Sequence, residues 1–348
     1  MRTIATGVLG VLALLALHGA AAAESGIQVP AGFRVQTFAR GLSQPTAMAY
    51  GPDGRIYVTE STGKVVAIKR GTRRPAVLVR GLRTPLGLVW RGRTLFVSEQ
   101  GRLERFVLSG GRLAGRHVVV KGIPFGEHQQ DNVVLGHDGR LYWGSGSTCD
   151  ACKERSRRSA AILSLRPDGS DLRVVASGLR NPYGLAVQPS TGRLYASVNG
   201  QDKLGSDTAP QPAEMVVAVK KGAFYGWPRC WPNAQTLRLS GRCSGVTPPV
   251  AYLEPHASAD GIAFYTGHSF PAAYRGTLFV AEWGQYLSNR FGRRVVRVQL
   301  RKGHPARVTS FASGFAHPLA LLVDQRGGLL VADWGRGAVY RIQAASRS

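Results

Sequence analysis

Acidic residues are scarce in this sequence, and their scarcity sets its charge. Against 45 lysines and arginines there are only 20 aspartates and glutamates, which gives a formal net charge of +25. Such a field attracts anions, among them nucleic acids, acidic polysaccharides and anionic cofactors. The basic residues are nevertheless scattered, whereas nucleic-acid-binding proteins gather them on one face or in a known motif. We therefore expect no nucleic-acid partner.

Long apolar runs are also missing, apart from one near the start of the chain. Arg2 precedes this run, and Ala21, Ala22 and Ala23 follow it as a small-residue cleavage site. The pattern is typical of a secretory signal peptide, with a retained anchor as the alternative. We predict a signal peptide over residues 1–23, cleavage near Ala23 and a secreted or periplasmic protein. No other segment has the length of a membrane span.

Only four cysteines are present, at positions 149, 152, 230 and 243. An even number in a secreted chain indicates disulfides. A zinc site would need a second closely spaced cysteine pair or a nearby histidine, and a thioredoxin-type site would need a βαβ unit. Neither is found. Of the three possible pairings we favour Cys149–Cys152 with Cys230–Cys243, since each closes a local loop.

No serine- or proline-rich linker divides residues 24–348, so we expect a single domain there. What this region contains instead is a repeat with apolar, turn and apolar segments, often ending in an acidic residue. Its copies begin at Gly41, Gly81, Gly122, Gly178, near His256 and at Gly314. Each copy predicts a β-hairpin. Hairpins of this kind must stack to bury their apolar faces, so the sequence predicts an all-β, six-bladed β-propeller.

Alignment of the copies predicts one ring of residues before the first strand of each hairpin. The loop into the innermost strand of a propeller blade borders the axial channel. The ring positions are Gln44, Thr84, Gln129, Asn181, Ser258 and His317, preceded by Ser43, Arg83, His128, Arg180, Ala257 and Ala316. The ring is polar and basic, with histidine suited to general base catalysis and arginine to binding carboxylates. It fits an anionic ligand beside a hydroxyl that loses a proton.

Each of these residues also has a structural interpretation. His128 could be a solvated loop histidine, Arg180 could cap carbonyls of an adjacent blade, and Asn181 before Pro182 is a common turn pair. A second polar cluster follows the fourth hairpin and comprises Asn199, Gly200, Gln201, Asp202, Leu204, Gly205, Asp207 and Glu214. Its oxygen ligands could hold Ca²⁺, although the spacing is not that of an EF-hand and a polar loop is the alternative.

Several segments resemble the pyrroloquinoline quinone (PQQ)-dependent glucose/sorbosone dehydrogenases over nearly all of residues 24–348. The most specific are GEHQQDNVVLGHDGRLYWGSGSTCDAC, ASGLRNPYGLAVQPSTGRLYASVNGQDKLG, KKGAFYGWPRC and GIAFYTGHSFPAAYRGTLFVAEWG. The resemblance implies a six-bladed propeller, in agreement with the repeat count. It also implies binding of PQQ and Ca²⁺ and oxidation of a small sugar.

The resemblance assigns roles to particular residues. His128 matches the base that takes a proton from the sugar hydroxyl, and Arg180 and Asn181 match a pair that contacts the quinone. Gly200 and Gln201 match the residues whose carbonyls bind Ca²⁺. Tyr225 and Trp227 match a family hallmark near the active face. Gln129, His317 and Arg290, with Gln285 as an alternative to Arg290, are the other expected cofactor contacts.

The sequence departs from the family pattern at several of these places. Asp131 stands where a small residue is usual, and Ser147 stands where glucose-type members carry an acidic partner for the histidine. His317 replaces an arginine, and Leu319 occupies the next contact position. We expect PQQ- and Ca²⁺-dependent oxidation of an aldose or a sorbosone-like sugar. The alternatives are a non-catalytic propeller that binds a sugar or a partner, and a metal-dependent lactonase, for which the ring positions lack Asp and Glu.

Overall fold

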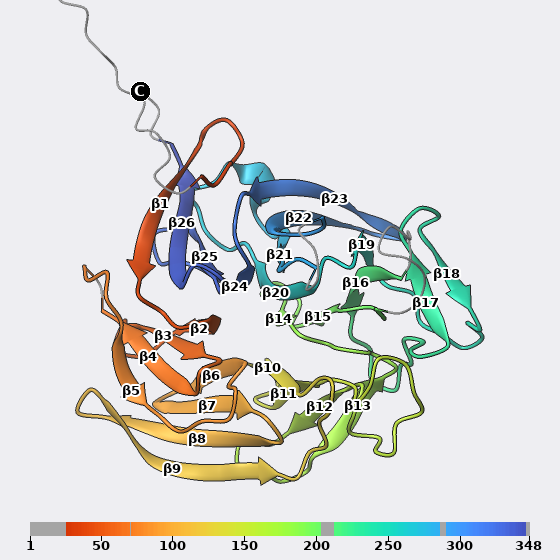
Figure 1. Cartoon of the computed structure of the whole chain (residues 1–348), viewed down its shortest axis with the longest axis horizontal. Coiled ribbons are helices and arrows are strands. Elements are labelled where there is room, and N and C mark those ends of the chain that lie inside the picture. Colours follow the sequence, from red (N-terminus) through yellow and green to blue (C-terminus); the bar gives the residue numbers. More distant parts are fainter. Residues whose placement is uncertain (1–25, 70, 203–211, 286–289, 346–348) are drawn as a thin grey trace, which may run out of the picture.

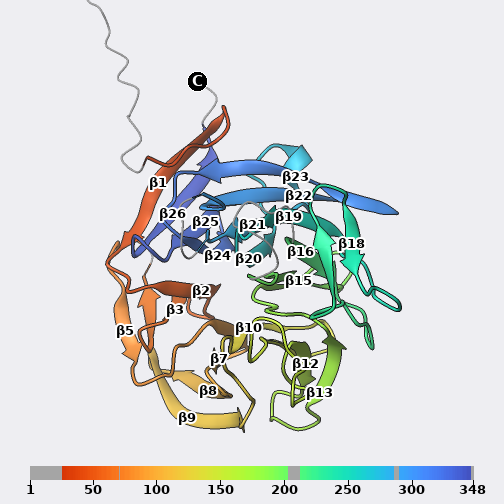
Figure 2. The same ribbon diagram turned by 45° about the vertical axis from the view of Figure 1, so that its right-hand side comes forward.

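The fold consists of six four-stranded antiparallel sheets around a central axis (Figures 1 and 2). The computed structural model describes residues 26–69, 71–202, 212–285 and 290–345. Each hairpin repeat forms the two innermost strands of one sheet, and the innermost strands point their edges toward the centre of the ring in Figure 1. The predicted all-β, six-bladed propeller is therefore confirmed. The predicted signal peptide, 1–23, lies outside the described residues.

The blades are numbered in the order of their innermost strands. Blade 1 contains β2 (Pro45–Tyr50), β3 (Ile56–Glu60), β4 (Lys64–Ile68) and β5 (Ala76–Val79). Blade 2 contains β6 (Gly87–Arg91), β7 (Thr94–Glu99), β8 (Arg102–Ser109) and β9 (Arg112–Lys121). Blade 3 contains β10 (Gln130–Leu135), β11 (Leu141–Ser145), β12 (Ala161–Leu165) and β13 (Arg173–Ser177).

The second half of the ring adds an inserted hairpin and a short 3-10 helix, Ala272–Tyr274. Blade 4 contains β14 (Leu185–Val187), β15 (Leu194–Val198), β16 (Ala213–Ala218) and β19 (Ala251–Pro255). The inserted hairpin is β17 (Cys230–Asn233) and β18 (Arg238–Gly241). Blade 5 contains β20 (Ala259–Phe264), β21 (Leu278–Glu282), β22 (Arg294–Arg301) and β23 (His304–Ser313). Blade 6 contains β24 (Pro318–Val323), β25 (Leu329–Asp333), β26 (Ala338–Ala344) and β1 (Phe33–Arg40).

The ring is closed by strands from both ends of the chain. Strand β1 is the outermost strand of blade 6, where Phe33 pairs with Ala344 and Arg40 with Ala338. The repeat alignment did not assign this strand. Its pairing with β26 holds the strand that precedes blade 1 in the sheet of blade 6 through backbone hydrogen bonds, and this closes the ring.

Apolar side chains fill the spaces between neighbouring blades. Trp143 of blade 3 is fully buried, and its indole Nε1 donates to the Ser98 hydroxyl of blade 2 at 2.6 Å. Tyr57 of blade 1 packs edge-on against Trp90 of blade 2. Burying a large apolar side chain stabilises a fold by about 1.5–3 kcal/mol. The packing of neighbouring blades therefore buries the apolar side chains that a single hairpin would leave exposed.

The second strand of four blades ends in a buried acid. These residues are Glu60, Glu99, Glu282 and Asp333. Glu60 accepts the backbone N–H of Ser43 at 2.8 Å, and Asp333 accepts that of His317 at 2.9 Å, so the acid fixes the loop into its own inner strand. Blades 3 and 4 carry Ser145 and Val198 at the corresponding places.

Both favoured disulfides, Cys149–Cys152 and Cys230–Cys243, are present. The first closes a loop of blade 3, and the second ties the base of the inserted hairpin. Among the described residues, no helix has the length and apolarity needed to cross a membrane.

Candidate active site

The loops that enter the inner strands of blades 3 and 4 meet at one end of the propeller. His128, Gln129 and Asn181 line a cavity of about 290 Å³ together with Asp131 and Tyr183. Gly146 lets the two loops approach, because a Cβ there would collide with His128 Cβ and Asn181 Oδ1. Predicted site residues from two blades therefore share one space.

A narrower pocket adjoins the Arg180 side of these loops. Arg180, Gly200, Gln201 and Trp227 line it. Gly200 donates its backbone N–H to the Glu214 carboxylate at 2.8 Å, and the Gln201 side-chain amide donates to the Pro228 carbonyl at 2.8 Å. The Gly200–Gln201 segment is thus fixed beside Arg180. Leu204, Gly205 and Asp207 of the predicted Ca²⁺ loop lie outside the described residues.

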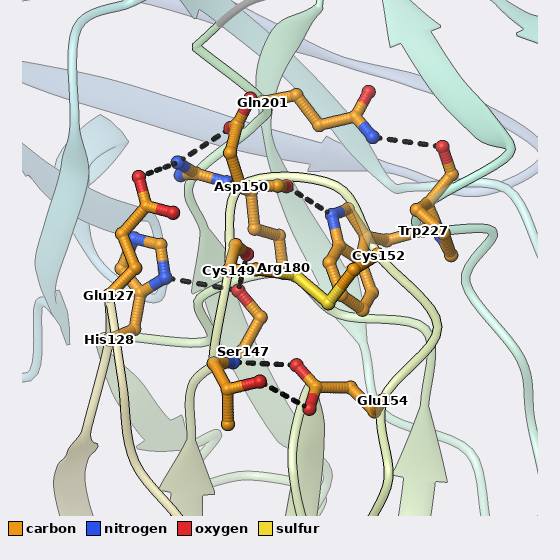
Figure 3. The surroundings of a disulfide bond; sticks show 12 residues. Glu127, His128, Ser147, Cys149, Asp150, Cys152, Glu154, Arg180, Gln201 and Trp227 are labelled. Carbon is orange, nitrogen blue, oxygen red and sulfur yellow. Dashed lines mark hydrogen bonds and ion pairs between the residues drawn. A yellow bond between two sulfur atoms is a disulfide. The ribbon is translucent and has the colours of Figure 1, made fainter.

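Hydrogen bonds set the tautomer of the neutral His128 ring. Its Nδ1 lies 3.0 Å from the Ser147 hydroxyl, which donates its only hydrogen to the Cys149 carbonyl at 2.7 Å (Figure 3). The hydroxyl can therefore only accept from His128, so Nδ1 carries the proton and Nε2 keeps a free lone pair. Ser147 is the partner of the histidine, at the position where the resemblance placed one.

The surroundings of His128 keep its imidazole neutral. Burial, and then the positive charge of Arg180, lower the pKa of His128 to about 3. At neutral pH the imidazole is therefore unprotonated, whereas an ordinary histidine is more than half protonated below pH 6.5. His128 is thus in the form that a general base requires, with a proton affinity below that of an ordinary histidine.

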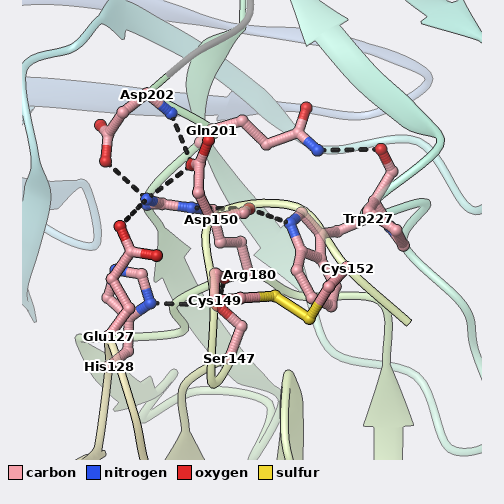
Figure 4. A network of polar contacts seen from close by, with 12 residues as sticks. Glu127, His128, Ser147, Cys149, Asp150, Cys152, Arg180, Gln201, Asp202 and Trp227 are labelled. Carbon is pink, nitrogen blue, oxygen red and sulfur yellow. Dashed lines mark hydrogen bonds and ion pairs between the residues drawn. A yellow bond between two sulfur atoms is a disulfide. The ribbon is translucent and has the colours of Figure 1, made fainter. Parts of the chain in front are cut away.

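Arg180 is buried, and its guanidinium group lies next to three carboxylates. Its guanidinium NH2 lies 2.6 Å from Asp202 Oδ2, 2.9 Å from Asp150 Oδ1 and 3.9 Å from Glu127 Oε1 (Figure 4). Only 3% of Arg180 is exposed. Three carboxylates surround one guanidinium, so the cluster has a formal net charge of −2. The ring that the sequence predicts to be basic is therefore acidic at this place.

The short disulfide loop positions Asp150. Its backbone carbonyl accepts the indole N–H of Trp227 at 2.9 Å and the Arg180 Nε–H at 3.3 Å, and its carboxylate accepts the Asp202 backbone N–H at 2.8 Å. Figure 3 shows Trp227 beside the Cys149–Cys152 bridge. One residue of a four-residue loop thus connects blade 3 to the loops of blade 4.

Glu127, Asp150 and Asp202 form a group that could hold a metal ion. One carboxylate oxygen of each lies within 4.8 Å of the others. Carboxylate oxygens are ligands that Ca²⁺ prefers. Sequence reasoning named Asp202 but missed Glu127 and Asp150. Two features of the sequence could have identified them: Glu127 directly precedes His128, and Asp150 lies between Cys149 and Cys152.

Two predicted cofactor contacts lie in other surroundings. The His317 ring stacks on Trp283 with centroids 3.9 Å apart, and its Nδ1 lies 3.1 Å from the Trp283 carbonyl oxygen. Arg290 lies over the ring of Phe291. Neither residue is among those that line the two pockets described above. Their roles stay predictions.

Solved structures of similar fold include several sugar dehydrogenases. The holo form of the pyranose dehydrogenase PQQ domain from Coprinopsis cinerea superposes with a TM-score of 0.77 at 18% identity, covering 92% of this chain and 97% of that one. The PQQ-bound aldose sugar dehydrogenase of Streptomyces coelicolor gives a TM-score of 0.70 at 23% identity, with 91% and 100% coverage. These likenesses concern the fold.

Sequence comparison gives the family. The aldose sugar dehydrogenase YliI of Escherichia coli (strain K12) is 25% identical over 31% of this chain and 28% of its own length. An uncharacterized protein of Borreliella burgdorferi is 23% identical over 91% of each chain. The profile of the Glucose / Sorbosone dehydrogenase family matches residues 96–331, which is more than half of the sequence. The chain belongs to the glucose/sorbosone dehydrogenase family.

Proposed function

We propose that this protein is a PQQ- and Ca²⁺-dependent dehydrogenase that oxidises an aldose or a sorbosone-like sugar with His128 as general base. Membership of the family indicates an oxidoreductase acting on sugars. The observation that carries the finer proposal is the hydrogen-bonded tautomer of His128, which leaves Nε2 unprotonated in a cavity of about 290 Å³. A volume of this size is at the lower end of small-molecule sites.

The residues present fit both groups. Three carboxylates surround a single guanidinium, so the cluster of Glu127, Asp150 and Asp202 can accept a further cation. Arg180 and Asn181 would contact PQQ, and Gly200 and Gln201, next to Asp202, would contribute carbonyl oxygens to Ca²⁺. The buried Oδ1 of Asn181 has no partner in the described structure, which is consistent with a ligand beside it.

When bound, PQQ would supply the two-electron acceptor, and Ca²⁺ would polarise it. The protein groups perform the remaining steps. His128 Nε2 takes the proton of the substrate hydroxyl, or of a hydrated aldehyde, while Ser147 holds the Nδ1 proton in place. Arg180 stabilises negative charge that develops in the site.

We also propose that the protein is secreted or periplasmic, with residues 1–23 as a signal peptide and 24–348 as a single domain. The two disulfides support this compartment, because disulfides persist in oxidising environments. Mass spectrometry of the protein exported by its own leader should give an N-terminus near Glu24. An intact Met1 in the exported protein would contradict the proposal.

The test of the proposed activity is reconstitution. The purified protein is incubated with PQQ and Ca²⁺, its absorbance is recorded after gel filtration, and dye reduction is measured across aldoses and sorbosone. We expect cofactor absorbance to travel with the protein and at least one sugar to be oxidised. Absence of both would overturn the proposal. Calorimetric sugar binding without cofactor uptake would favour the non-catalytic propeller.

The assays must also distinguish the proposed dehydrogenase from a metal-dependent lactonase. The ring positions lack Asp and Glu, but Asp131 and Asp260, both buried, follow the ring positions of blades 3 and 5 by two residues. Lactone hydrolysis with Ca²⁺ and without PQQ would support that activity. The same assay on His128→Ala would then show whether the two reactions share a base.

A further inference from the structure

A buried group of oxygen atoms lies on the axis side of blades 3, 4 and 5. Asp131 follows Gln130, which pairs with Ser145, and Asp260 follows Ala259, which pairs with Glu282. The two aspartates therefore occupy equivalent positions at the start of β10 and β20. Tyr183 holds the same position before β14. These inner strands converge on the centre of the ring in Figure 1, so the three side chains come from adjacent sectors of one layer.

Several of these oxygens have no hydrogen-bond partner in the described structure. They include Asp131 Oδ2, the Tyr183 hydroxyl and Asn199 Oδ1. Asp131 is 2% exposed and Tyr183 8%, and both line the cavity of about 290 Å³ that contains His128. Asp260 is 4% exposed and accepts one hydrogen bond, from Asn199 Nδ2 at 3.1 Å. Buried polar groups of this kind are normally satisfied, so each needs a partner.

Asp260 lies close enough to Asp131 for its charge to act on that carboxyl. Burial, and then the charge of Asp260, raise the pKa of Asp131 well above its usual value, and burial, followed by the charges of the two aspartates, raises the pKa of Tyr183. No lysine, arginine or histidine in the described part of the chain forms an ion pair with either aspartate. Buried charges in proteins are paired or coordinate metals.

We propose that Asp131, Asp260 and Asn199 bind a Ca²⁺ ion in the axial channel, separate from the site at Glu127, Asp150 and Asp202. The donors are two carboxylates and an amide carbonyl, all oxygen, which is the ligand type of Ca²⁺. Waters would complete the coordination. Of the three ligands, Asp131 lines the cavity that contains His128, and Asn199 lines the pocket beside Arg180.

The experiment uses the full protein without PQQ, so it does not depend on the proposed activity. The protein is stripped with EDTA, dialysed against micromolar CaCl2, and its bound calcium is counted by inductively coupled plasma mass spectrometry. Asp131→Asn and Asp53→Asn form the matched pair, since each replaces a carboxylate with an amide of the same shape and Asp53 is exposed at a turn of blade 1, outside both calcium sites. We expect Asp131→Asn to bind one equivalent of calcium fewer than the wild type and Asp53→Asn to bind as many as the wild type.

Thermal unfolding distinguishes a specific loss of calcium binding from general misfolding of the variant. Without calcium, Asp131→Asn should melt at or above the wild-type temperature, because it replaces a buried carboxyl group that has an unpartnered oxygen with a neutral amide of the same shape. Saturating Ca²⁺ should raise the melting temperature of the wild type more than that of Asp131→Asn. The proposal is overturned if the wild type binds no calcium, or if Asp131→Asn binds as many equivalents as the wild type and gains as much in melting temperature.

Discussion

Blades 3 and 4 differ from the other four in how they use their acidic residues. In blades 1, 2, 5 and 6 the second strand ends in a buried acid that holds the protein's own backbone or an arginine. Asp333, for example, accepts the N–H groups of Ala316 and His317, and Glu282 pairs with Arg294 at 2.5 Å. In blades 3 and 4 this acid is replaced by Ser145 and Val198.

The loops of blades 3 and 4 are held by other means. Gln130 of blade 3 accepts the Gly101 N–H at 2.7 Å and donates to the Ser145 hydroxyl at 3.1 Å. Glu214, from the third strand of blade 4, accepts the Gly200 N–H. An acid that recurs in the repeat is therefore structural, and acids outside the repeat, such as Asp150 and Asp202, mark the candidate site.

The largest predicted change is a loss of activity when His128, the proposed general base, is replaced. His128→Ala should lower kcat on the order of 10²–10⁴-fold, because a positioned base contributes that much. PQQ binding and melting temperature should change little. Dye reduction with the reconstituted protein measures it. The matched control is His137→Ala, an exposed histidine in the same blade, and equal activity of the two variants would contradict the assignment.

The next largest predicted change is in stability, and it concerns Asp333, one of the buried acids that end the second strand of four blades. Asp333→Ala should lower the free energy of unfolding by about 3 kcal/mol, because it leaves several buried N–H groups without a charged acceptor. Denaturant unfolding measures it. Asp202→Ala, whose side chain is 66% exposed, should cost far less stability and instead weaken calcium and cofactor binding. The reverse ranking would refute the division into structural and functional acids.

A third prediction concerns pH. The pKa of His128 is lowered to about 3, so the base stays unprotonated and kcat/KM should hold well below pH 6.5. Ser147→Asp places a carboxylate against Nδ1, which favours the protonated imidazole and raises that pKa. The acidic limb of the profile should then move up by about 1–2 pH units. An unchanged profile would mean that His128 does not set this limb.

The smallest expected effect is on affinity. Asp150→Asn keeps the shape of the disulfide loop but removes the charge that orients Arg180, and it should raise the dissociation constant for PQQ with Ca²⁺ about 10-fold, or about 1.4 kcal/mol. Equilibrium titration followed by absorbance measures it. Asp53→Asn, which removes an exposed carboxylate at a blade 1 turn, should leave the constant unchanged.

The sequence was sufficient for the fold because the repeat carries both the strand pattern and the blade count. It could not place β1, since pairing with β26 joins residues about 300 positions apart and leaves no local mark. Column alignment brought His128 and Arg180 to one place. It missed Asp150, because the disulfide loop, not the repeat, carries that residue to Arg180.

Asp131 illustrates a different limit of sequence reasoning. The sequence marked it as a departure from a family pattern, at a site where a small residue is usual. Its proposed role depends on Asp260, which is two blades away and whose charge acts on Asp131 only in the closed ring. A pattern within one repeat cannot show an interaction between different blades.

The most direct test of the proposed site is a single-turnover measurement. Wild type and His128→Ala are loaded with PQQ and Ca²⁺, an oxidisable sugar is added in a stopped-flow instrument, and the absorbance of the bound quinone is followed. We expect equal loading of the two proteins and a reduction rate at least 100-fold lower in His128→Ala. Equal loading with equal reduction rates would contradict it.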